Sequence, residues 1–149
     1  MESVKGLREI DWDRELTPDE REICHTQAAL FAFCQKDYQY DAFDFITKFM
    51  KSDIAASIDT NGAEYSSMKP SEFIESLRGK LTALPLSERR SVEALHWVGY
   101  IYRYWAWLGT PSKEIINVVP VEDAYSVYYS FHTLDVKEAL SMLVSQVAQ

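Results

Sequence analysis

Residues 93–115, EALHWVGYIYRYWAWLGTPSKEI, decide the fold class of this chain. They hold three of its four tryptophans and three of its nine tyrosines, arranged around one arginine, Arg103. A helix turns by about 100° per residue, so these rings cannot share one face. A helix that is apolar nearly all round is usually buried in the middle of a domain. The stretch predicts a central helix that begins near Ser87 and ends at Gly109.

The polar atoms of this helix leave a second interpretation open. One stripe is expected to face the core: Val92, Leu95, Val98, Gly99, Tyr102, Trp105 and Ala106. Other apolar residues spread around the circumference: Trp97, Tyr100, Tyr104, Trp107 and Leu108. Buried hydroxyl and indole N–H groups need hydrogen-bond partners, and an unpaired buried guanidinium is costly. Either Arg103 meets a carboxylate inside, or that edge opens to solvent or to a partner.

Helical patterns continue on both sides of the central helix. The clearest start is Thr17 as N-cap, Pro18 at the first helical position and Glu20 completing a capping box. Asp135 is expected to cap the last helix. Further helices are predicted over residues 16–36, 41–59 with a possible kink, 71–84 with Ser71 as a possible cap, 112–120, 121–131 and 135–146. The one β-branched apolar run, residues 116–121, contains a proline that weakens a strand.

Length and composition fit one all-α domain. The chain has 149 residues, of which 47% are hydrophobic and 26% charged, as in globular proteins. We predict a single-domain bundle of six to seven helices over residues 1–149, with residues 1–15 as an irregular N-terminal arm. No apolar run of about 18 residues predicts a membrane span, and the N-terminus lacks the apolar core of a signal peptide. We therefore expect a cytoplasmic protein.

Cysteine spacing bears on disulfide bonding, and net charge bears on the kind of partner that the protein binds. Cys24 and Cys34 lie ten residues apart in one helical pattern, about 15 Å along the axis, which excludes a disulfide between them. The formal net charge of −8 opposes nucleic-acid binding, which needs a basic face. The same charge favours encounter with a more basic protein partner.

A second aromatic cluster follows the central helix. It contains Tyr125, Tyr128, Tyr129, Phe131 and His132. Tyr, Trp and Arg are enriched at binding hot spots, so the two clusters together predict one partner-binding groove. The predicted partner contacts are Tyr100, Arg103, Tyr104, Trp107, Tyr128, Tyr129 and His132. A surplus of rings equally fits a homodimer interface, and His132 next to a helix start also has a local, structural interpretation.

Two Glu-x-x-His pairs, Glu22 with His25 and Glu93 with His96, support an alternative. Facing pairs of this kind, with one more glutamate from each of two other helices, form the di-iron site of ferritin-like bundles. Here the first pair lies at the beginning of the first clear helix, so residues 1–15 would have to supply a ligand. The alternative is a di-metal oxidase or metal carrier. The simpler interpretation is a solvated Glu22 and a hydrogen-bonded, partly buried His96.

Motifs for catalysis are not visible in the sequence. Five glycines form neither a P-loop nor a dinucleotide fingerprint, and there is no G-x-S-x-G elbow. Neither cysteine has the context of a nucleophile. We therefore expect a non-enzymatic protein and no cofactor.

Three short segments resemble a family of small bacterial proteins. They are the pattern W-x-G-Y-x-Y-R-Y-W at residues 97–105, Ser-Lys-Glu-Ile at residues 112–115 and His-Thr-Leu-Asp at residues 132–135. The likeness covers about the last 60 residues, with a looser match at residues 45–59. It implies an antitoxin or immunity role, in which the protein binds and neutralises a toxin enzyme, and it brings no catalytic residues. A mobile-element inhibitor of a host defence protein is a further alternative that the sequence does not separate from the first.

Overall fold

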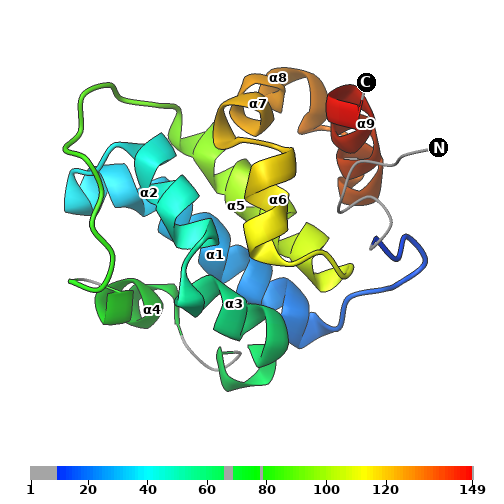
Figure 1. Cartoon of the computed structure of the whole chain (residues 1–149), viewed down its shortest axis with the longest axis horizontal. Coiled ribbons are helices and arrows are strands. Elements are labelled where there is room, and N and C mark those ends of the chain that lie inside the picture. Colours follow the sequence, from blue (N-terminus) through cyan, green and yellow to red (C-terminus); the bar gives the residue numbers. More distant parts are fainter. Residues whose placement is uncertain (1–9, 66–68, 78, 149) are drawn as a thin grey trace.

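The computed structural model describes residues 10–65, 69–77 and 79–148 and shows an all-α bundle, which confirms the predicted fold class (Figure 1). Across these residues the chain forms nine α-helices and one short 3-10 helix, and an isolated β-bridge joins Tyr40 and Pro85. The helices are α1 Pro18–Tyr38, α2 Ala42–Met50, α3 Asp53–Thr60, α4 Pro70–Leu77, α5 Val92–Trp107, α6 Ser112–Val118, α7 Val121–Ser126, α8 Tyr128–Phe131 and α9 Val136–Ala148; the 3-10 helix η2 is Gly62–Tyr65.

Helices α1 and α5 pack along each other at the centre, and the other helices surround them (Figure 1). They run antiparallel, since Gln27 in the middle of α1 donates to the carbonyl of Gly99 (3.1 Å), while Gln35 near the end of α1 donates to the carbonyl of Arg90, just before α5 (2.7 Å). A Cβ at Gly99 would lie 2.7 Å from the backbone Cα of Ala28. Glycine is therefore what allows the two backbones to approach so closely.

The capping contacts predicted for the starts of α1 and α9 and for the end of α5 are present in the structure. The Thr17 hydroxyl accepts from Glu20 N–H (3.1 Å), and the Glu20 carboxylate accepts from Thr17 N–H (2.9 Å), which is the expected capping box. Asp135 accepts from Lys137 N–H (3.1 Å) at the start of α9. Gly109 follows α5 with φ +124°, a left-handed conformation that glycine tolerates.

Helix α5 begins later than predicted. The cap is Ser91, whose hydroxyl accepts from Ala94 N–H (3.2 Å), and not Ser87. The preceding residues have other backbone partners, because Leu86 N–H donates to Gln39 and Arg90 N–H donates to the Gln35 side chain. These contacts hold the chain across the end of α1, so the helix starts only after them.

Two other predicted helices differ from the observed ones. The segment 41–59 contains both α2 and α3, because Ser52 caps a new helix through Ala55 N–H (3.2 Å). The segment 71–84 is helical only to Leu77, since Gly79 adopts φ +84° and ends it. Helix α4 begins at Pro70, so Ser71 lies within its first turn and is not its cap.

The helices of the C-terminal half are as predicted, except that one predicted helix is divided into two. Residues 112–118 are helical and α7 begins at Val121, so the apolar run over residues 116–121 contains no strand. The single helix predicted over residues 121–131 is divided at Val127 into α7 and α8. Tyr125 of α7 accepts from the backbone N–H of Ser91 (2.8 Å) and so links α7 to the start of α5.

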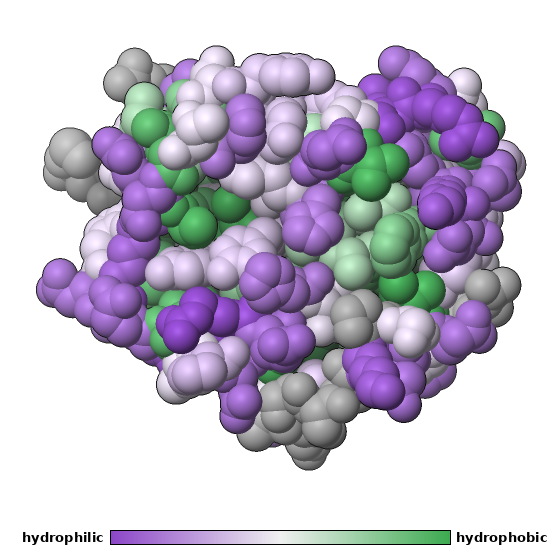
Figure 2. All heavy atoms as spheres, turned by 180° about the vertical axis from the view of Figure 1, so that it is seen from behind, coloured by the Kyte–Doolittle hydropathy of each residue, from purple (hydrophilic) through white to green (hydrophobic). Residues whose placement is uncertain are grey.

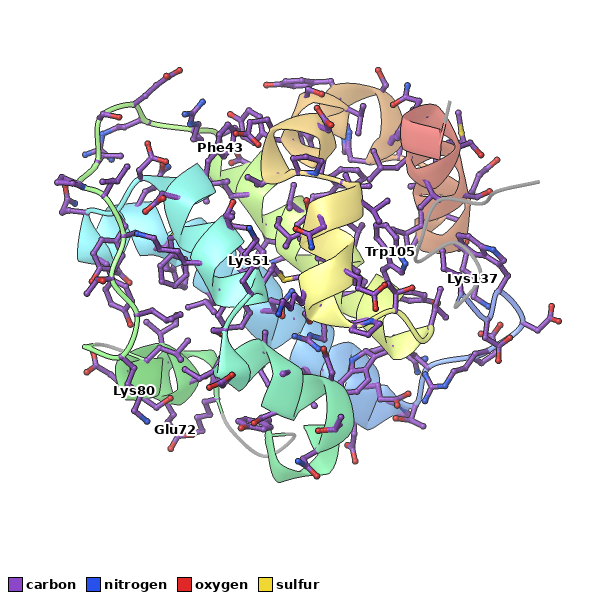
Figure 3. The ribbon with its side chains drawn as sticks, in the orientation of Figure 1. Phe43, Lys51, Glu72, Lys80, Trp105 and Lys137 are labelled. Atoms are coloured by element: carbon purple, nitrogen blue, oxygen red, sulfur yellow. The ribbon has the colours of Figure 1, made fainter. Side chains whose placement is uncertain are left out.

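The lead-in to α1 is irregular where it is described, from Ile10 onward; residues 1–9 of the predicted arm lie outside the described residues. Asp11 N–H donates to the carbonyl of Leu108 (2.8 Å). The ammonium of Lys137 on α9 reaches Glu15 in the lead-in (3.0 Å; Figure 3). The lead-in is thus attached both to the end of α5 and to α9.

No described helix is both long and apolar enough to cross a bilayer. Figure 2 shows the molecule from behind, where hydrophobic side chains reach the surface in separate patches bordered by hydrophilic ones. Five large hydrophobic side chains among the described residues are exposed: Trp12, Leu84, Val92, Tyr129 and Met142.

Candidate functional site

Two rings of α5 belong to the core. Tyr102 and Trp105 are fully buried, and Figure 3 shows Trp105 inside the bundle. The Tyr102 hydroxyl donates to the carbonyl of Val119 (2.6 Å), and the Trp105 indole N–H donates to the Thr110 hydroxyl (2.9 Å). Burial raises the pKa of Tyr102 well above its ordinary value. With their polar atoms paired inside, these two rings are not available to a partner.

Arg103 is also a core residue, which corrects its prediction as a partner contact. Its side chain is 0% exposed and forms an ion pair with the carboxylate of Asp59. Its Nε donates to Gln27 (2.9 Å) and its Nη2 to Ser112 (3.3 Å). Asp59 in turn accepts from the backbone N–H (2.8 Å) and the hydroxyl (2.7 Å) of Ser112. The first of the two interpretations therefore holds: Arg103 meets a carboxylate inside.

Other rings of the two aromatic clusters line a groove between α5 and α8, which we call the aromatic groove. Its volume is about 440 Å³. It is lined by Val92, Glu93, His96, Trp97, Tyr100, Tyr128 and His132. The structure thus brings Tyr100 of the first aromatic cluster and Tyr128 and His132 of the second together on the lining of one groove.

Ring contacts fix the walls of the aromatic groove. Trp97 of α5 and Tyr128 of α8 meet edge to face, with centroids 5.8 Å apart and planes at 68°. His132 stacks on Tyr128 at 4.3 Å, and its Nδ1 lies 2.7 Å from the carbonyl oxygen of Tyr128. Tyr100 is held by His25 of α1, with centroids 5.0 Å apart. The rings are therefore positioned before any ligand arrives.

Two exposed apolar residues extend the groove. Val92, on its lining, is 40% exposed. Tyr129, next to Tyr128 with ring centroids 5.3 Å apart, is 81% exposed, the largest exposed fraction of any large hydrophobic residue described. A ring so exposed contributes little to the stability of the isolated chain, so its apolar surface is available for contact.

Tyr104 and Trp107 lie further along α5, outside the groove. Tyr104 neighbours Tyr100, with ring centroids 6.2 Å apart, and burial raises its pKa. Trp107 packs its ring against Gly62 and lies 5.6 Å from the guanidinium carbon of Arg103. Its indole N–H is buried and has no hydrogen-bond partner among the described residues. Tyr104 and Trp107, which were predicted as partner contacts, are both half-buried. Trp107 lies on a different side of the molecule from the aromatic groove.

The residues of the di-metal alternative do not form a metal site. Across the described parts of the chain, no group of three or more His, Cys, Asp or Glu side chains is placed to hold a metal ion. His25 contacts the ring of Tyr100, and His96 lines the aromatic groove. Partial burial, reinforced by the nearby charge of His25, lowers the pKa of His96. Among the described residues, Glu22 and Glu93 do not join these imidazoles in a cluster that could hold a metal ion.

The two cysteines form no disulfide with each other, as predicted, and both are buried. Both lie on α1, and burial raises the pKa of each thiol to about 12. A thiol that stays protonated is a poor nucleophile, so neither cysteine is placed for covalent chemistry.

Four groove residues were not predicted as partner contacts: Val92, Glu93, His96 and Trp97. The sequence contains a pattern that could have identified three of them. Positions 93, 96 and 97 share one helix face with Tyr100, at three- and four-residue spacing. What the sequence lacked was the position of α8, which decides that this face, and not the one carrying Arg103, borders the second cluster.

Comparison of the chain with protein-family models, with curated proteins and with solved structures found no match.

Proposed function

We propose that this chain is a non-enzymatic interaction protein that binds a more basic protein through the aromatic groove, and that this partner is a bacterial toxin enzyme which it neutralises. The observation that carries the proposal is the aromatic groove itself, built from Trp97, Tyr100 and Tyr128 and bordered by the exposed Tyr129. Trp and Tyr are the residue types that dominate binding hot spots, especially in partly enclosed, apolar surroundings.

The groove is preorganised for binding. Its rings are fixed by contacts between α1, α5 and α8, so few side-chain rotations would be lost when a partner docks. Less ordering on binding leaves more of the contact free energy available for affinity. A rigid aromatic surface is thus suited to a specific protein partner.

Charge supports a basic partner. The chain carries a formal charge of −8, which would steer a positively charged enzyme toward it and raise the association rate. In the proposed mechanism, the aromatic residues anchor the complex while the acidic body covers the cleft of the toxin. Substrate would then be excluded without any chemistry by this chain.

The test is a binding measurement with the product of the adjacent gene, followed by co-expression. Wild-type protein is expected to form a complex measurable by calorimetry and to restore growth. Trp97→Ala and Tyr129→Ala are expected to weaken the complex by about 30-fold, the effect of losing about 2 kcal/mol at a hot spot. Trp12→Ala is the matched control, because Trp12 is a partly exposed ring outside the groove.

Two outcomes would overturn the proposal. One is the absence of both a complex and growth rescue; the other is a complex that Trp97→Ala and Tyr129→Ala leave unchanged. A homodimer that Tyr129→Ala dissociates, measured by sedimentation, would assign the groove to a second copy of the chain instead. A host defence protein bound at the same groove would support the mobile-element alternative and reject the toxin.

A further inference from the structure

We infer that the aromatic groove is a receptor for one arginine side chain of the partner protein, whose guanidinium packs against the rings that line the groove. The inference rests on the proposed function in one respect, that a protein carries the arginine. The cation site itself depends only on the geometry of the groove.

The aromatic walls provide the first argument. Trp97 and Tyr128 stand at 68° to each other, and Tyr100 lines the same groove. Each of these rings lines the groove, and the face of an aromatic ring carries the negative part of its quadrupole, which attracts organic cations. Trp gives the strongest cation–π attraction of the aromatic residues. The groove therefore has the wall composition of a cation site.

The charged groups on the lining provide the second argument. Glu93 is the one carboxylate among the lining residues, and these include neither lysine nor arginine. Glu93 is anchored at the start of α5, where one of its carboxylate oxygens lies 3.3 Å from the Ser91 hydroxyl. A carboxylate at the mouth of an aromatic pocket adds a charge-assisted contact for a guanidinium. The lining thus favours a cation over a neutral or anionic group.

The histidines are consistent with this preference. His25, His96 and His132 are the only histidines of the chain, and all three line or contact the groove. Because partial burial lowers the pKa of His96, that imidazole is neutral at physiological pH and does not repel a cation.

Arginine fits better than lysine for two reasons. The planar guanidinium stacks on ring faces and is more weakly hydrated than an ammonium, so it enters an apolar site at lower desolvation cost. The chain itself shows the geometry, since the guanidinium carbon of Arg90 lies 3.8 Å from the ring centroid of Phe43. A groove of about 440 Å³ also accommodates one long side chain.

The experiment is an NMR titration of the whole chain with a pentapeptide that has one arginine between glycines. The matched probe replaces arginine by citrulline, which keeps the shape and removes the charge. Saturable shifts of the Trp97 indole resonance are expected with the arginine peptide, and binding about tenfold weaker with citrulline. Trp97→Ala and Tyr128→Ala are expected to abolish binding. Trp12→Ala should leave it unchanged.

Glu93→Gln keeps the inference falsifiable if the ring variants fail to fold, because Glu93 is exposed and its replacement removes only charge. About threefold to tenfold weaker binding of the arginine peptide is expected. Equal binding of the two peptides, or no effect of Glu93→Gln on a folded protein, would overturn the cation site.

The outcomes separate the two proposals. Arginine-peptide binding without any partner complex would reject the proposed function and support the cation site. A partner that still docks in the groove after its interface arginines are changed to glutamine would support the function and reject the cation site.

Discussion

Arg103 shows what a single residue contributes to this fold. Its position in a ring-rich helix predicts that it needs a carboxylate if it is buried. The partner, Asp59, lies 44 residues earlier, and nothing in the local pattern distinguishes it from other acidic residues. The need was therefore predictable from sequence, whereas the partner and the burial itself were not.

Asp59→Ala is expected to destabilise the protein by about 3–5 kcal/mol, because it leaves the buried guanidinium of Arg103 without its counter-charge. Urea unfolding measures the change. Asp37→Ala, which removes an exposed carboxylate near the end of α1, should alter the free energy of unfolding by less than about 0.5 kcal/mol. An equally small effect for Asp59→Ala would show that the ion pair does not hold the core.

The thiols of Cys24 and Cys34 are expected to resist modification in the native state. Their burial, with pKa values of about 12, leaves almost no thiolate at pH 8. Reaction with a chromogenic disulfide reagent should be at least about 100-fold slower than in guanidinium-unfolded protein, where both thiols react. Rapid labelling of native protein would mean that α1 is accessible.

At the scale of elements, the sequence predicted helix starts better than helix lengths. The capping box at Thr17 is a local chemical signal, so the start of α1 was correct. The late start of α5 and the early end of α4 depend on contacts between distant segments, such as Asp41 N–H with the carbonyl of Leu84 (2.8 Å). Such tertiary contacts override local periodicity and leave no mark in a local window.

The packing of α1 on α5 leads to a prediction at Gly99. Helix propensity alone would make Gly99→Ala stabilising by about 1 kcal/mol. The new Cβ would lie 2.7 Å from the Cα of Ala28 and 2.8 Å from the carbonyl oxygen of Gln27, and backbone atoms cannot yield without separating the helices. A net loss of about 1–3 kcal/mol is expected in urea unfolding. A gain in stability would contradict this close approach.

At the scale of the whole molecule, the candidate site arises from α8 meeting one face of α5. Both aromatic clusters could be read from the sequence, and so could the idea that they share a groove. The sequence could not predict which rings line the groove, because this depends on how α5 is rotated about its axis in the bundle. Arg103 points inward to Asp59, while Trp97 and Tyr100 point toward α8. Rotation of a helix that is apolar on most sides is poorly fixed by its own pattern.

The groove makes stability depend on pH through His96. Its pKa is lower in the folded state than the ordinary value of 6.5, so the folded protein binds this proton less readily than the unfolded chain. The contribution of neutral His96 to the free energy of unfolding is fully present above about pH 6.5, and it declines as the pH falls toward the lowered pKa. Urea unfolding at pH 7.5 and 5.5 should show a smaller decline for His96→Gln than for wild type. Identical declines would show that other groups account for the pH dependence.

The bonding of the Arg103 side chain to three other helices has a consequence for how the molecule unfolds. Its partners Gln27, Asp59 and Ser112 belong to α1, α3 and α6, so one guanidinium on α5 joins four helices. A partly unfolded form that releases α1, α3 or α6 leaves the buried guanidinium with a hydrogen-bond donor that has no acceptor. Such forms are therefore disfavoured. These helices therefore constitute one cooperative unit, whose amides should exchange with solvent deuterium at a common, slow rate.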